Sequence, residues 1–170
     1  LAFLVGMAII LIVSTITAVG LNVLAEGNAK KANKTMYSKI SELRTTTMSK
    51  SGEWYMVISC QDNTYTLETH HVANGEDNIK DTSKFSASRI SLNYYNGDSS
   101  TGYDLRNNSL KIQFNKNDGS CKSVKIIDTE EFITDNLDSP QFGKIVASVS
   151  RNNTYESKLW YKTGRVTTQN

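Results

Sequence analysis

Residues 1–25 read LAFLVGMAIILIVSTITAVGLNVLA and contain no charged side chain. A helix of this length, rising 1.5 Å per residue, reaches about 37 Å, which exceeds the roughly 30 Å hydrocarbon core of a bilayer. The segment 1–25 therefore predicts a transmembrane helix. The residues that we expect to contact lipid or neighbouring helices are Leu1, Phe3, Leu4, Gly6, Ile9, Ile10, Val13, Ile16 and Gly20.

The helical pattern continues through residues 26–52, but there it becomes amphipathic. Small and apolar side chains recur at spacings of three and four, which places them on one face of a helix. We expect a globular head to pack on this stripe, chiefly through Met36, Ile40 and Leu43. Ser51-Gly52 is the predicted end of the helix, because glycine readily adopts the left-handed conformation that closes helices. The stripe consists of Ala25, Ala29, Ala32, Met36, Ile40, Leu43 and Thr47.

From residue 53 the apolar period changes from about 3.6 to 2, which is typical of β-strands. Gln61-Asp62-Asn63 predicts a hairpin turn, whereas the polar residues 74–84 predict a loop. One long helix followed by strands predicts an α+β fold, in which residues 53–170 form an antiparallel sheet laid on the helical stripe. The segments with strand-like alternation are 54–58, 65–67, 90–94, 110–114, 124–126, 145–149 and 159–161.

Charge is distributed unevenly along the chain, although the net charge is only +2. Residues 26–50 contain six Lys or Arg and two Glu, a net charge of +4, which leaves −2 for residues 51–170. The basic surplus lies next to the predicted membrane segment, where lysines contact water or anionic headgroups. Taken alone, the positive-inside rule places these lysines in the cytoplasm, and a basic leader upstream would reverse that orientation.

No arrangement of residues in the sequence indicates an enzyme or a metal site. Neighbouring residues of a strand point to opposite faces, so His70 and His71 cannot easily share one ion with Glu76 and Asp77. The chain carries no GxSxG, HExxH, Walker or paired Cys-x-x-Cys motif. We therefore expect a non-enzymatic protein without a metal ion or cofactor.

The two cysteines, Cys60 and Cys121, lie 61 positions apart, a spacing that fits no metal motif. If the head lies outside the membrane, a disulfide closing this loop would stabilise it by roughly 4 kcal/mol in the chain-entropy model. Two buried free thiols are the alternative, and the sequence leaves both states open.

The C-terminal run KLWYKTGRVT at 158–167 interleaves basic and aromatic residues. This composition suits contact with phosphates together with stacking on bases, which makes Lys158, Lys162 and Arg165 candidates for DNA contact. The alternative, which we favour, is a final strand with a turn at 162–165 that leads to an edge.

A membrane helix, an amphipathic stalk and a strand-rich head together resemble type IV pilins and pseudopilins. Three segments are similar to the strand, phenylalanine-turn-glycine and terminal Thr-Gly-Arg-Val pattern of H-type minor pseudopilins: LKIQFNKNDGS at 110–120, IVASVS at 145–150 and KLWYKTGRV at 158–166. LRTTTMSK at 43–50 resembles the end of the long helix in those proteins.

This resemblance implies a structural subunit in the bacterial cytoplasmic membrane, with its head outside, that assembles through its apolar helix into a type IV pilus, type II secretion or competence filament. The implied partners are membrane lipid, other pilin-like subunits, a prepilin peptidase and the assembly machinery, with DNA as a further partner in a competence system. Pilins carry a leader and a Phe-Thr-Leu-x-Glu segment, and we expect residue 1 to fall just after that segment. The alternative function is a single-pass membrane protein whose extracytoplasmic head binds a ligand or a cell-wall component.

Overall fold

The computed structural model describes residues 2–129, 131–132, 141–150 and 153–169, and within the helix it describes side chains from Val23 onward. The protein is α+β, with one helix, α1 (Ala2–Ser49), followed by strands in two antiparallel sheets. The six-stranded sheet A has the order β3 (Glu76–Ser86), β2 (Thr64–Ala73), β1 (Glu53–Gln61), β6 (Leu110–Phe114), β7 (Cys121–Ile126) and β8 (Glu131–Phe132). The five-stranded sheet B has the order β11 (Val166–Gln169), β10 (Asn153–Trp160), β9 (Phe142–Ser150), β4 (Ser91–Asn96) and β5 (Gly102–Asp104).

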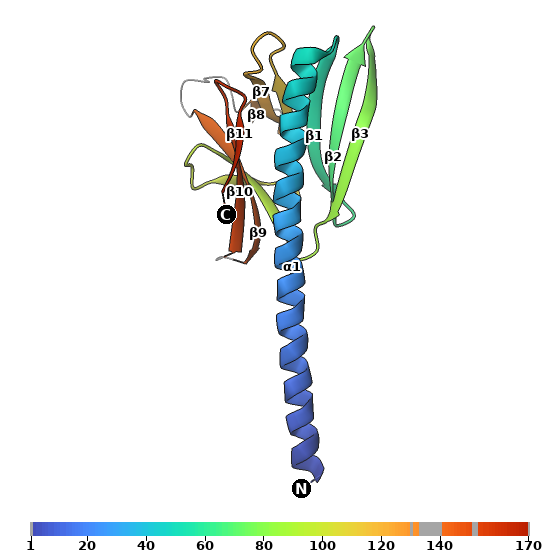
Figure 1. The fold of residues 1–170 in the computed structure, drawn as a ribbon, viewed down its shortest axis with the longest axis vertical. Helices are drawn as coiled ribbons and strands as arrows, with labels where there is room; N and C mark the ends of the chain where they lie inside the picture. Colours follow the sequence, from blue (N-terminus) through green and yellow to red (C-terminus); the bar gives the residue numbers. More distant parts are fainter. Residues whose placement is uncertain (1, 130, 133–140, 151–152, 170) are drawn as a thin grey trace.

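The C-terminal half of α1 packs on the head through the stripe that the sequence predicts (Figure 1). All seven residues of the stripe, from Ala25 to Thr47 at spacings of three and four, are buried, with at most 4% of each residue exposed. The N-terminal half of the same helix extends beyond both sheets. The helix ends at Ser49, slightly before the predicted stop, and Gly52 has the expected left-handed conformation with a φ of +85°.

The prediction of one sheet over the helix is wrong, because the strands form two sheets that both contact α1. Strands β1, β3 and β6 of sheet A and strands β9, β10 and β11 of sheet B all pack against the helix. Open twisted sheets rarely exceed about ten strands without splitting. Two sheets also give the helix apolar cover from two directions, which one sheet does not provide.

The seven predicted strands are all present, but residues 74–84 do not form the predicted loop. They belong largely to β3, which pairs with β2 along its length, and Asn74 and Gly75 form the connecting turn with φ values of 55° and 83°. Such positive values are typical of the tight turns that join hairpin strands. Because β3 is an edge strand whose side chains are mostly exposed, no apolar alternation marks it in the sequence.

Three fully buried tyrosines, Tyr65, Tyr94 and Tyr161, lie in the core, and Tyr65 helps to join the two sheets. The hydroxyl of Tyr65, in sheet A, accepts a hydrogen bond of 3.1 Å from the backbone N–H of Leu92 in sheet B. The hydroxyls of Tyr94 and Tyr161 bond to each other, and Tyr161 also donates to Asn96 at 2.8 Å. Each buried hydroxyl therefore has a partner, and burial raises the pKa of all three phenols.

Truncating the helical stripe tests whether it stabilises the head. Ile40→Ala removes a side chain that is 1% exposed, and we expect the free energy of unfolding to fall by about 2–5 kcal/mol. Urea unfolding followed by tryptophan fluorescence measures the change. Ser38→Ala, at an exposed position on the same helix, is the control and should change stability by less than about 0.5 kcal/mol. Equal effects of the two substitutions would contradict the packing described here.

Candidate functional site

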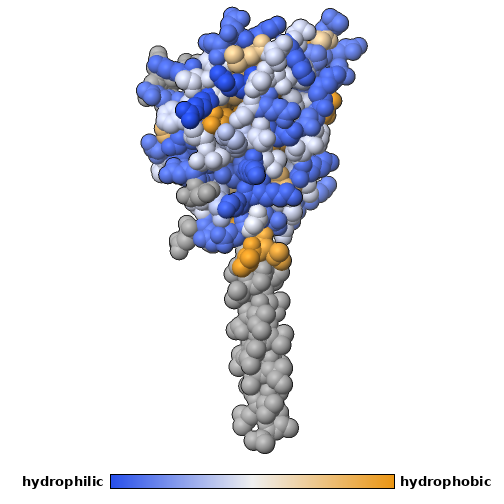
Figure 2. All heavy atoms as spheres, in the orientation of Figure 1, coloured by the Kyte–Doolittle hydropathy of each residue, from blue (hydrophilic) through white to orange (hydrophobic). Residues whose placement is uncertain are grey.

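The point where α1 leaves the head is the first candidate site. The hydroxyl of Tyr155, in β10, donates a hydrogen bond of 3.0 Å to the Glu26 carboxylate, and the neighbouring Ala25 is buried. Val23 and Leu24, directly before it, are 64% and 65% exposed. Figure 2 shows apolar side chains gathered immediately below the head. The cover supplied by the head therefore ends at Ala25, while the apolar surface of the helix continues.

The predicted membrane and assembly residues precede this point and lie outside the residues whose side chains the structure describes. The backbone of residues 2–22 is helical and continuous with the stalk. Among the residues whose side chains the structure describes, no helix is both long and apolar enough to cross a membrane. The membrane segment 1–25 therefore stays a prediction. The residues concerned are Leu1, Phe3, Leu4, Gly6, Ile9, Ile10, Val13, Ile16 and Gly20.

Polar contacts attach α1 to sheet B within its buried stripe. Asn33 is only 4% exposed, and its side-chain oxygen accepts a hydrogen bond of 2.6 Å from the hydroxyl of Ser157 in β10. The Asn33 amide also donates to the backbone oxygen of Glu156 at 3.4 Å. Because both side chains are buried, loss of either partner would leave a polar group without a hydrogen bond.

Two further contacts attach α1 to sheet A and to the turn between β6 and β7. The Lys39 ammonium lies 3.1 Å from the Asp81 carboxylate of β3 and 2.9 Å from Glu42. Hydrogen bonds to these two carboxylates raise the pKa of Lys39 above its usual value, and the bond to Glu42 has the larger effect. The Arg44 guanidinium donates a hydrogen bond of 2.9 Å to the backbone oxygen of Gly119. The stalk is thus held to both sheets by directional contacts as well as by apolar packing.

The exposed face of the stalk next to this attachment is basic. Lys30, Lys31 and Lys34 are all exposed, within three turns of Leu24. A shallow groove of about 280 Å³ runs between α1 and β11, lined by Lys30, Asn33, Lys34, Tyr37 and Thr168. The positive charge at this position suits contact with anionic headgroups or with acidic groups of another protein.

The C-terminal basic residues occupy one hairpin, formed by β10, a turn and β11. The predicted turn at 162–165 is confirmed, and the edge to which it leads is strand β11 of sheet B. Lys162 and Arg165 are exposed in this turn and line a hollow beside Trp160. Lys158 lies elsewhere, with its ammonium 4.5 Å from the ring centre of Phe142 and 5.8 Å from that of Trp160. The structure therefore brings two of the three predicted DNA contacts into one hollow.

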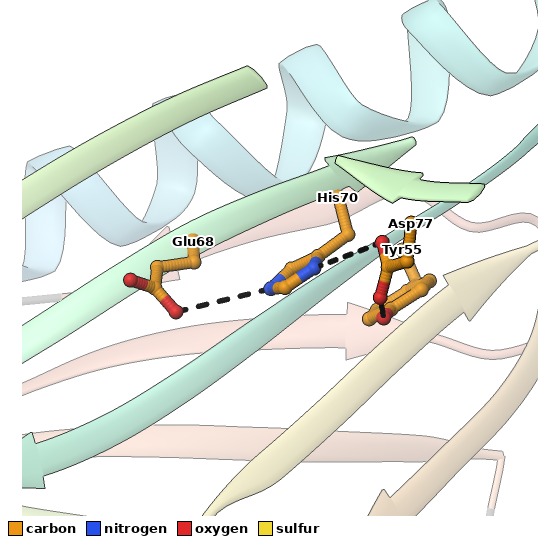
Figure 3. A network of polar contacts seen from close by, with 4 residues as sticks. All are labelled: Tyr55, Glu68, His70 and Asp77. Atoms are coloured by element: carbon orange, nitrogen blue, oxygen red, sulfur yellow. Dashed lines mark hydrogen bonds and ion pairs between the residues drawn. The ribbon is translucent and has the colours of Figure 1, made fainter. Parts of the chain in front are cut away.

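Sequence reasoning missed a polar cluster on sheet A, formed by Tyr55, Glu68, His70 and Asp77 (Figure 3). The Tyr55 hydroxyl donates a hydrogen bond to the Asp77 carboxylate, which also lies 3.2 Å from Nδ1 of His70. Nε2 of His70 lies 3.8 Å from Glu68, and the rings of Tyr55 and His70 stack with centroids 4.6 Å apart. The cluster joins β1, β2 and β3 across the sheet.

Hydrogen bonding and burial shift two pKa values within this cluster. The hydrogen bond from Tyr55 is the main cause that lowers the pKa of the Asp77 carboxyl. Burial is the main cause that raises the pKa of Tyr55 to about 12, and the hydrogen bond to Asp77 is the next. The phenol is therefore protonated at neutral pH. His71 lies on the other face of the sheet and stacks on Trp54 at 4.1 Å. The predicted separation of His70 and His71 is thus confirmed, and no group of three metal-binding side chains occurs in the described parts of the chain.

The two cysteines lie too far apart in this fold for a disulfide, so the structure supports the free-thiol alternative. Cys121, in β7, lies opposite Phe114 of the neighbouring strand β6. Gln113, the residue before Phe114, lies opposite Tyr55 of β1, so Cys121 is level with the start of β1. Cys60 lies five residues beyond Tyr55 in β1, which separates the two cysteines by at least about 17 Å along the strand at 3.4 Å per residue. A disulfide requires Cα atoms within about 7 Å.

Comparisons with known proteins give no relative for this chain. No family model matches it, and no match was found among curated proteins or among solved structures.

Thiol titration tests the state of the cysteines. Burial raises the pKa of Cys121 to about 12 and that of Cys60 above its usual value, and a protonated thiol is a poor nucleophile. We expect Cys121 to resist a thiol reagent in the folded protein and both cysteines to react in denaturant without a reductant. Cys60→Ser should leave one thiol, reactive only after unfolding. An absence of reactive thiol in the denatured, unreduced protein would show a disulfide instead.

Proposed function

We propose that this chain is a structural, pilin-like subunit whose N-terminal helix is held in the bacterial cytoplasmic membrane and later packs in the core of a filament. The observation that carries the proposal is the division of α1 into two parts. Its C-terminal half is buried in the head from Ala25 to Thr47, and its N-terminal half extends beyond the head (Figure 1). The extending half has an uncharged sequence, so it needs an apolar environment that the head does not supply.

Lipid and neighbouring helices can supply that environment in turn. Burying one leucine or isoleucine side chain contributes about 1.5–3 kcal/mol, and residues 1–25 contain many of them. Gly6 and Gly20 are small enough to allow close approach of neighbouring helices, which favours association of membrane segments. A segment that is solvated by lipid before assembly and by other subunits afterwards keeps its apolar surface out of water in both states.

The attachment of α1 to both sheets also supports a filament subunit. Contacts of Asn33, Lys39 and Arg44 with the head fix the position of the helix, so the head moves with the helix as one body. A filament whose subunits associate through their helices would then display the heads in a defined arrangement. The proposed partners are other pilin-like subunits, a prepilin peptidase and the machinery of a type IV pilus, type II secretion or competence system.

The alternative function, a monomeric membrane-anchored head that binds a ligand or wall component, makes a different demand on the helix. An anchor requires only an apolar segment, whereas a filament core also requires close packing between helices. A substitution that adds bulk without adding polarity separates the two functions.

Gly6→Leu is that substitution, and we expect it to leave the protein in the membrane fraction while reducing the amount recovered in sheared filaments. The added side chain preserves hydropathy but prevents close helix approach. Immunoblots of carbonate-washed membranes and of sheared surface material measure both quantities. Unchanged filament recovery would contradict close helix packing at Gly6, and absence of the wild-type chain from any filament would favour the monomeric alternative.

Ile9→Arg is the complementary substitution, and we expect it to reduce both membrane retention and assembly. An arginine near the centre of a membrane helix disfavours insertion by about 2.5–3.5 kcal/mol. Ile9→Leu is the matched control and should behave as the wild-type chain. Normal incorporation of the arginine variant would contradict burial of this segment in lipid and in a filament core.

A further inference from the structure

The hollow beside Trp160 is the feature of the head that the proposed filament role does not explain. It has a volume of about 440 Å³ and combines an aromatic ring, two cationic side chains, an amide and a hydroxyl. We name it the Trp160 hollow, and its lining residues are Gln141, Trp160, Lys162, Thr163 and Arg165.

The backbone around the Trp160 hollow is held by short hydrogen bonds. The backbone N–H of Gly164 donates to the oxygen of Trp160 at 2.7 Å, and the N–H of Trp160 donates to the oxygen of Arg165 at 2.9 Å. The N–H of Tyr161 donates to the oxygen of Gln141 at 2.9 Å, which fixes the backbone of another lining residue. A ligand would therefore meet a turn that is already ordered, which reduces the entropy cost of binding.

Gly164 also allows this turn to lie close to the β6–β7 turn of the head. It has a left-handed φ of +62°, and a Cβ atom at this position would lie 1.8 Å from the backbone oxygen of Gly119. Only glycine allows the β10–β11 turn to approach the β6–β7 turn so closely. The same Gly119 oxygen accepts the hydrogen bond from Arg44 near the end of α1.

The indole ring of Trp160 is supported by neighbours that do not line the hollow. Its Nε1 donates a hydrogen bond of 3.3 Å to Thr167, and Phe142 packs against it with ring centroids 5.3 Å apart. The ammonium of Lys158 lies near both rings, and neither Phe142 nor Lys158 lines the hollow. The supported ring is thus presented to the hollow beside the cations Lys162 and Arg165.

We propose that the Trp160 hollow binds single-stranded nucleic acid, with a base stacked on Trp160 and the adjoining phosphates contacted by Lys162 and Arg165. An aromatic platform next to cations is the combination that binds single strands without sequence preference, because every base has a flat face. Gln141 contributes an amide that can hydrogen-bond the edge of the stacked base. A duplex is a poorer ligand, since its base faces are hidden in the stack.

The place of the hollow in the fold favours a ligand from solvent over a lipid headgroup. The turn that carries Lys162 and Arg165 contacts Gly119, which lies next to Arg44, five residues before the end of α1 at Ser49. This end of the head is opposite to the end where α1 emerges (Figure 1). The proposal stands on this geometry alone and does not depend on assembly of the chain into a filament.

Binding of a fluorescent oligothymidylate of about 12 nucleotides to the full chain in non-ionic detergent tests the proposal. Fluorescence anisotropy over a range of salt concentrations gives the affinity and its salt dependence. Trp160→Ala should weaken binding by about five- to 150-fold, the range expected for loss of one stacked base. Lys162→Gln and Arg165→Gln should each weaken binding and reduce the slope of log affinity against log salt by about one unit.

Matched controls separate this site from general attraction of an anion to a basic protein. Lys84→Gln removes an exposed lysine from β3, outside the hollow, and should leave affinity unchanged. An abasic strand of equal length and charge should bind at least about fivefold more weakly than oligothymidylate, because it lacks bases to stack. Trp160→Phe keeps a stacking ring, and it should bind more tightly than Trp160→Ala.

Three results would overturn the proposal. The first is equal binding of the abasic strand, and the second is equal loss of affinity in Lys84→Gln and Arg165→Gln. The third is no measurable binding of the oligonucleotide by the wild-type chain at low salt. If Trp160→Ala does not fold, as judged by near-ultraviolet circular dichroism, the comparison of Arg165→Gln with Lys84→Gln still decides the question.

Discussion

Burial of one stripe of α1 between two sheets is the interaction on which the rest of the structure depends. An isolated helix is marginally stable in water even when its sequence favours helix, so tertiary packing of the stripe from Ala25 to Thr47 stabilises the stalk. In return, the stripe supplies apolar cover to strands of both sheets. The helix, sheet A and sheet B are therefore parts of a single core.

The buried pair Asn33 and Ser157 adds positional specificity to this packing. Ala25, Ala29 and Ala32 are nearly interchangeable, so packing of this part of the stripe distinguishes poorly between the observed position of α1 and one displaced by a helical turn. Such a shift would separate Asn33 from Ser157 and leave buried polar groups unpaired, at a cost of about 1–3 kcal/mol for each group. The pair fixes how far the helix extends beyond the head, and so where Val23 and Leu24 leave its cover.

Local patterns in the sequence predicted the local features of the fold, and pairing between distant segments accounts for what they missed. The stripe of α1 and the seven strands each follow from one periodicity within one segment. The division into two sheets does not, because it depends on pairs such as β4 with β9, which lie far apart in the chain. The edge strand β3 has no apolar face to reveal it, although Asn74-Gly75 is a recognisable hairpin turn.

The same distinction applies to the candidate sites. The predicted turn at Gln61-Asp62-Asn63 joins the strands that carry Tyr55 and His70, but their pairing depends on the observed turn at Asp62-Asn63, which differs by one residue. The contribution of Asp77 was not accessible to sequence reasoning, because it required the missed second hairpin. Lys162 and Arg165 were recognised by composition, whereas the support of Trp160 by Phe142 depends on the pairing of β9 with β10.

One helix both extends from the head and is buried in it, and this has a mechanical consequence. The long strands of both sheets run roughly along the axis of α1 (Figure 1), so tension applied to the emerging end of the helix enters the head parallel to those strands. A load in that direction acts at once along the whole buried stripe and on the contacts of Asn33, Lys39 and Arg44 with the head. The stalk is consequently held against pulling by many contacts that must break together rather than one after another.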